Sequence, residues 1–209
     1  AIAAAVERAG VEPGEIEDVY FGAAKLGLSF AFIHSNVSPI WPPTGIAIAA
    51  VLLLGNRVWP GIFVGALLVN LIVPLPLPAA LGIAAGNTLE ALVARFILQR
   101  LSFDISFERA RDVFKLVVTA GACTIVSATI GTLSLCLTAS AGWHLFGSLW
   151  LTWWLGDLAG AVTLGPLFLS WFGPHGVRLK NLRYAETALA VVFGERIGAA
   201  HDVASLSGK

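Results

Sequence analysis

The sequence predicts an all-α fold, a polytopic transmembrane bundle of about six spanning helices. Long apolar runs alternate with short connections, and every second connection carries Arg or Lys while the others carry no charged residue. This pattern is typical of a multi-pass membrane protein. The composition agrees, because 57% of the residues are hydrophobic and only 12% are charged, about half of the charged fraction of a soluble domain. The net charge is zero, so no nucleic-acid partner is expected.

Six apolar runs are long enough to cross a bilayer, which takes about 20 mostly apolar residues in a helix. The predicted spans are residues 20–37, 41–56, 59–77, 79–98, 113–138 and 145–172. The second and third runs open with Trp-Pro, and proline at a first helical position loses no hydrogen bond. The second run is the shortest, so a re-entrant segment is the alternative there.

The charged connections predict the orientation of the bundle. The basic residues follow the second, fourth and sixth runs, and they are Arg57, then Arg100, Arg109, Arg111 and Lys115, then Arg178, Lys180 and Arg183. Positively charged connections stay in the cytoplasm. Both ends of the six-helix block are therefore expected to be cytoplasmic, with the lipid bilayer as the surrounding partner.

The two ends of the chain differ from this block. Residues 1–19 form an acidic, Ala-rich, non-membrane segment that resembles a short stretch of the thiolase family, but the reactive-cysteine motif of that family is absent. A foreign origin is one interpretation of this segment. Residues 20–172 are expected to form the membrane-embedded domain, and residues 173–209 a cytoplasmic tail with a truncated seventh helix at 184–193. The sequence contains no methionine, which predicts a piece of a longer protein.

Three of the predicted helices carry two glycines four residues apart. The pairs are Gly61 and Gly65, Gly82 and Gly86, and Gly156 and Gly160. Such a pair lets a neighbouring backbone come close, which favours helix association in lipid. Packing within the bundle is the expected role, and a homodimer face is the alternative.

Acidic residues inside the predicted spans are the main candidates for function. Glu90 and Asp157 lie within apolar runs, where an ionised carboxylate costs about 3 kcal/mol. Both are therefore expected to face the interior of the bundle. Asn87 shares a helix face with Glu90, because the two are three residues apart.

A stripe of aromatic residues accompanies Asp157. Trp150, Trp153 and Trp154 precede it at helical spacing, which places three indoles and one acid on one face. One interpretation is a site for a proton or for a small polar or cationic signal molecule. The alternative is a polar clamp, in which the acid accepts hydrogen bonds from neighbouring helices and the indoles pack.

The sequence lacks the motifs of the common enzyme classes. It has no phosphate-binding loop, no G-x-S-x-G nucleophile motif and no cysteine pair at zinc spacing. No catalytic residue, cofactor or metal site is therefore expected.

Four ordered motifs carry a resemblance to a known family. They are W-P-P-x-G at 41–45, W-P-G at 59–61, G-N-x-x-E-A at 86–91 and W-W-x-G-D at 153–157. Together they make residues 20–170 resemble the first type of MASE domain, the bacterial membrane-associated sensor family.

The resemblance implies a multi-pass sensory input domain of the bacterial inner membrane. It further implies a separate cytoplasmic output module, a histidine kinase or a diguanylate cyclase, which this chain lacks. Such a module would place the parent protein in two-component or cyclic di-GMP signalling. The implied signal partner is an unknown small molecule or membrane protein. The alternative function is a small permease or a membrane subunit of a transport system.

Overall fold

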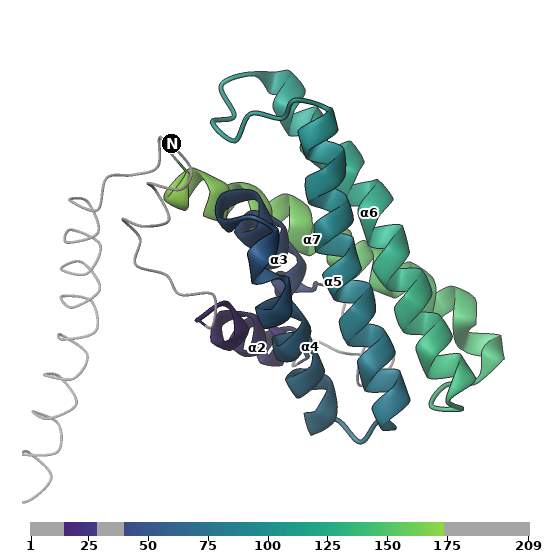
Figure 1. Ribbon diagram of the computed structural model, residues 1–209. Coiled ribbons are helices and arrows are strands. Elements are labelled where there is room, and N and C mark those ends of the chain that lie inside the picture. Colours follow the sequence, from purple (N-terminus) through teal and green to yellow (C-terminus); the bar gives the residue numbers. More distant parts are fainter. Residues whose placement is uncertain (1–14, 29–39, 174–209) are drawn as a thin grey trace, which may run out of the picture. The chain divides into compact units, whose positions relative to one another are not determined.

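The computed structural model describes residues 15–28 and 40–173, and within them the chain is helical and contains no strand. The all-α prediction is confirmed for this part (Figure 1). The helices in order are α2 (Glu15–Leu28), α3 (Pro42–Leu54), the short 3-10 helix η1 (Asn56–Val58), α4 (Trp59–Ile72), α5 (Leu77–Arg100), α6 (Ala110–Leu137), the 3-10 helix η2 (Trp143–Leu145) and α7 (Phe146–Phe172). The predicted seventh helix, residues 1–14 and residues 29–39 lie outside the described residues.

Within the described residues, three helices are long and apolar enough to cross a membrane. These are α5, α6 and the continuous segment Trp143–Phe172, which includes α7. The prediction of six spanning helices is therefore not confirmed. α3 has 13 residues and α4 has 14, about 20 Å of helix each, against a hydrocarbon layer of about 30 Å.

The two short helices end where the backbone cannot continue. α3 stops at Gly55, which has φ +92, a conformation that favours glycine. α4 stops at Ile72, five residues before the predicted end at position 77, because prolines at 74, 76 and 78 follow. The predicted run 41–56 gave the end of α3 to within two residues, whereas apolar composition did not reveal the earlier end of α4.

The first helix also differs from its prediction. α2 begins at Glu15, whereas residue 20 was the predicted start. Ile16 and Tyr20 are buried, so part of the segment assigned to the non-membrane end contributes to the core.

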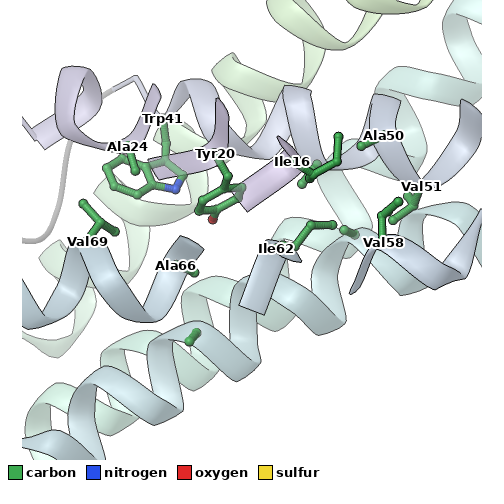
Figure 2. Close-up of a cluster of buried hydrophobic side chains, with 13 residues drawn as sticks. Ile16, Tyr20, Ala24, Trp41, Ala50, Val51, Val58, Ile62, Ala66 and Val69 are labelled. Atoms are coloured by element: carbon green, nitrogen blue, oxygen red, sulfur yellow. The ribbon is translucent and has the colours of Figure 1, made fainter. Parts of the chain in front are cut away.

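The helices pack in pairs around a central short helix. α5 lies along α6, as Figure 1 shows, and α7 contacts both α6 and α3. α3 is enclosed by the bundle, with all of its residues from Pro43 to Val51 buried. Side chains of α2, α3 and α4 form one hydrophobic cluster (Figure 2).

α3 begins near the middle of α7. The Trp41 N–H donates a hydrogen bond of 3.0 Å to the carbonyl oxygen of Gly156, which lies near the middle of α7. Pro42 and Pro43 follow at the first helical positions, where their missing N–H groups leave no donor unsatisfied. α3 thus covers about half the length of α7, and its N-terminus points into the centre of the bundle.

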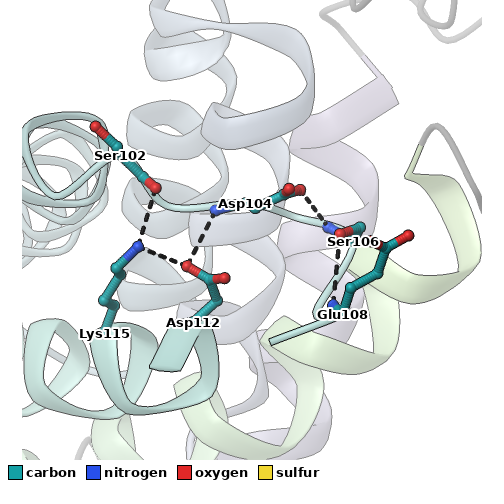
Figure 3. Close-up of polar contacts among 6 residues, drawn as sticks. All are labelled: Ser102, Asp104, Ser106, Glu108, Asp112 and Lys115. Atoms are coloured by element: carbon teal, nitrogen blue, oxygen red, sulfur yellow. Dashed lines mark hydrogen bonds and ion pairs between the residues drawn. The ribbon is translucent and has the colours of Figure 1, made fainter. Parts of the chain in front are cut away.

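The connection between α5 and α6 is held by polar contacts (Figure 3). Lys115 donates to Asp112 at 2.6 Å and to the Ser102 carbonyl oxygen at 3.0 Å. The Ser106 N–H donates to Asp104 at 3.0 Å, and this bond lowers the pKa of Asp104 below its ordinary value. The loop therefore has a defined conformation at the end of the bundle where the basic residues gather.

Candidate functional site: a buried polar centre

Asp157 is fully buried in α7 and accepts hydrogen bonds from two other helices. The Thr44 hydroxyl of α3 donates to one carboxylate oxygen at 3.0 Å, and the Ser127 hydroxyl of α6 donates to the other. Hydrogen bonds to an ionised carboxylate stabilise its charge. Asp157 therefore joins α3, α6 and α7, which is the arrangement of the polar clamp.

Glu90 in α5 is equally buried but is not satisfied in the same way. Its side chain is 1% exposed and lies close enough to Ser127 and Asp157 to interact with both. Neither of its oxygens has a hydrogen bond of ordinary geometry with any residue in the described part of the chain. A buried carboxylate without a partner is strongly unfavourable. The contacts of Glu90 within the described residues therefore do not offset the cost of burying it.

Three more polar side chains surround the acids. Asn87 lies one turn before Glu90 in α5, and the Tyr20 hydroxyl of α2 lies beside Asn87 and the Trp41 indole. The Trp41 nitrogen points toward Tyr20 in Figure 2. The polar atoms of all three side chains are buried, and none forms a hydrogen bond of ordinary geometry among the described residues.

We call this cluster the polar centre. It comprises Tyr20, Trp41, Thr44, Asn87, Glu90, Ser127 and Asp157. Glu90, Ser127 and Asp157 each lie near the middle of a long helix. In a bilayer, the cluster would therefore lie near the middle of the hydrocarbon layer.

No positive side chain pairs with either acid in residues 15–28 and 40–173, where the one ion pair joins Lys115 and Asp112. Arg95 is the basic residue nearest to Glu90 along α5, and it donates to the Val51 carbonyl oxygen at the end of α3. Within the described part of the chain, the Asp157 carboxylate is thus contacted by hydroxyl groups and not by a basic side chain.

The Trp150 and Trp154 side chains of the predicted stripe face α6. The Trp150 indole N–H donates to the Thr129 hydroxyl at 3.0 Å, and the Trp154 indole N–H donates to the Gly121 carbonyl oxygen at 3.0 Å. The two rings stack with centroids 6.1 Å apart. These indoles therefore act as packing groups with satisfied N–H donors.

Trp153 is the member of the stripe closest to the polar centre. It is 6% exposed, interacts with Asp157 and lies against Gly131 of α6. A Cβ at position 131 would contact the indole ring, so this glycine makes room for it.

The glycine pair of α7 allows α3 to come close. A Cβ at Gly160 would overlap the carbonyl oxygen of Trp41, and a Cβ at Gly45 would overlap the Gly160 carbonyl oxygen. Gly156 supplies the carbonyl that accepts from Trp41. Small residues here set the distance at which Thr44 reaches Asp157.

The other two glycine pairs contribute unequally to packing. A Cβ at Gly82 would meet the Ser134 side chain of α6, and a Cβ at Gly86 would lie 3.3 Å from Ile130 of the same helix. Gly65 lies against α2, with the Glu17 carbonyl oxygen 2.9 Å from its Cβ position. Gly61 is partly exposed.

Sequence reasoning missed four members of the polar centre, namely Tyr20, Trp41, Thr44 and Ser127. A usable signal existed for two of them, because a buried carboxylate needs donors and Thr44 and Ser127 are small hydroxyl residues within apolar runs. Tyr20 and Trp41 are the first residues of the predicted runs 20–37 and 41–56, and the structure has them 1% and 7% exposed.

The family model MASE1 matches residues 18–196, which is well over half of the chain and includes nearly all of the described residues. No curated protein and no solved structure matches the chain.

Proposed function

The chain belongs to the MASE1 family of membrane-associated sensor domains, and from this premise we propose that it is the sensory input domain of a bacterial signal-transduction protein. A sensor domain of this kind detects a signal and is not itself catalytic. Its output would come from a cytoplasmic module of the parent protein, a histidine kinase or a diguanylate cyclase. Family membership is the observation that carries this proposal.

We place the domain in the bacterial inner membrane as a six-helix block. α5, α6 and the segment ending in α7 would cross the bilayer fully, and the shorter helices would pack beside them. Arg57, Arg100, Arg109 and Arg111 lie in or beside connections that alternate along the sequence with uncharged ones, which supports cytoplasmic ends for the block. The output modules of two copies would meet beneath it as a homodimer.

The polar centre is the proposed sensing element. Asp157 joins α3, α6 and α7 through its hydrogen bonds. The nearby Glu90 and Asn87 side chains have polar atoms without a hydrogen-bond partner among the described residues. A small polar molecule, a cation or a membrane-protein partner that supplied the missing interactions would favour one packing of the helices over another. The end of α7 would transmit this change toward the output module.

The test uses the full-length parent protein in membranes, with output activity as the readout. Glu90→Gln and Asp157→Asn are expected to fix the output at a level that no longer responds to conditions that change the wild-type output. Glu108→Gln is the control, because Glu108 is an exposed loop residue. A wild-type response in both centre variants would remove the polar centre from the mechanism.

The identity of the parent is tested separately. The coding sequence downstream of this segment is expected to encode a kinase or nucleotide-cyclase module. A continuation into further membrane spans without such a module would contradict the sensor proposal and favour the transport alternative.

A further inference from the structure

We infer that Glu90 and Asp157 form a proton-binding site at the middle of the bundle, in which Glu90 holds the proton and Asp157 keeps its negative charge. This inference deepens the proposed function by naming the ligand of the polar centre, and it rests on that function for its biological role. Proton binding itself is a property of the chain that can be measured without any output module.

The two acids of the polar centre need a positive charge. Two carboxylates in contact cannot both be ionised in a medium of low dielectric constant, because each pays a desolvation penalty and the two repel. The titratable groups that face Glu90 from neighbouring helices are Tyr20, Cys123 and Asp157. None of these carries a positive charge, and Arg95 on the same helix is engaged with Val51. Neutralising one of the two carboxylates therefore takes a positive charge that the described residues do not supply.

The hydrogen bonds around the two acids decide which of them is neutral. Asp157 accepts hydrogen bonds from Thr44 and Ser127, and it faces the N-terminal turn of α3, where the helix dipole favours a negative charge. Glu90 accepts no hydrogen bond of ordinary geometry from a described residue. The proton is therefore assigned to Glu90, whose O–H group can then donate toward the Asp157 carboxylate.

The packing around the acids limits the size of the ligand. Glu90 and Asp157 are 1% and 0% exposed, and one turn before Glu90 the Cβ position of Gly86 already lies 3.3 Å from Ile130. A proton needs no additional volume, whereas a hydrated cation or an organic ligand would require the helices to separate. The tight packing therefore favours a proton.

An independent observation points to the same site. Asn87, 4% exposed, and the Tyr20 hydroxyl, 1% exposed, have no hydrogen-bond partner of ordinary geometry in the described structure, although both lie beside the acids. They offer hydrogen-bonding groups beside the protonated Glu90 side chain. In loading, a hydronium ion transfers one proton to a Glu90 oxygen, which leaves water and a neutral carboxylic acid, and no electrons move.

Infrared spectroscopy of the full 209-residue chain in detergent micelles tests the inference. At neutral pH the wild-type chain should show the C=O stretching band of a protonated carboxylic acid. Labelling the glutamate carboxyl groups with carbon-13 should shift this band, and labelling the aspartates should not. The absence of the band, or a shift on aspartate labelling alone, would overturn the assignment. This measurement needs no variant that could fail to fold.

Two comparisons sharpen the test. Glu90→Gln should abolish the band, and the matched variant Glu108→Gln should retain it, because Glu108 is an exposed loop residue away from the polar centre. Adding excess sodium chloride at constant pH should leave the band unchanged. Loss of the band in sodium but not in choline chloride would show that the site takes a metal cation instead of a proton. A band that survives in Glu90→Gln would contradict the inference without affecting the sensor proposal.

Discussion

Gly160→Ala is expected to destabilise the bundle by separating α3 from α7. A Cβ at this position would overlap the Trp41 carbonyl oxygen and lie 2.8 Å from the carbonyl carbon. Both atoms belong to the backbone, so α3 has to move, and overpacking of this kind costs about 1–3 kcal/mol. The movement also weakens the hydrogen bond from Thr44 to Asp157, worth about 1–2 kcal/mol. Alanine recovers about 1 kcal/mol through helix propensity, which leaves a net loss of about 1–4 kcal/mol.

The matched control for this prediction is Gly147→Ala in the same helix. Gly147 is exposed and no atom lies within 4 Å of its Cβ position, so this variant should be as stable as wild type or slightly more stable. The assay is reversible unfolding of the purified chain in mixed micelles, which gives the free energy of unfolding. Equal stabilities of the two variants would refute the close approach of α3 to α7.

Two further substitutions test individual hydrogen bonds by the same unfolding assay. Thr44→Val keeps the side-chain shape but removes a donor to Asp157, and it should cost about 1–2 kcal/mol. Thr163→Val should cost less than about 0.5 kcal/mol, because Thr163 is exposed and donates within its own helix; similar losses in both would argue against a special role for Asp157. Trp154→Phe leaves the Gly121 carbonyl without its indole donor and should cost about 1 kcal/mol, whereas an unchanged stability would mean that this bond contributes nothing.

The positions of the long helices could be predicted well from the sequence. α5 and α7 begin and end within two residues of the predicted runs 79–98 and 145–172, because their apolar stretches are bounded by proline, tryptophan or arginine. α3 also begins and ends within two residues of its predicted run 41–56, whereas α4 ends five residues before position 77. The end of α4 is decided by the prolines after Val73, which interrupt the backbone without changing the apolar composition.

The candidate site could be predicted only in part. The cost of charge in hydrocarbon indicates that Glu90 and Asp157 turn inward, and the structure has both fully buried. Their neighbours Thr44 and Ser127 come from helices far apart in the sequence, so periodicity cannot pair them with the acids. Helical spacing likewise places Trp154 on one face of its helix. It does not show which neighbouring helix that face contacts.

The placement of the polar centre inside the membrane is tested most directly by the depth of a spin label beside it. Leu89 is 44% exposed on the outer face of α5 and is adjacent to Glu90. A label on Leu89→Cys, in the chain reconstituted into lipid vesicles, should be accessible to molecular oxygen and protected from a water-soluble nickel complex, whereas a label on Arg109→Cys in the loop should show the opposite. Free access of the nickel complex to the label at position 89 would contradict a membrane-embedded sensor domain.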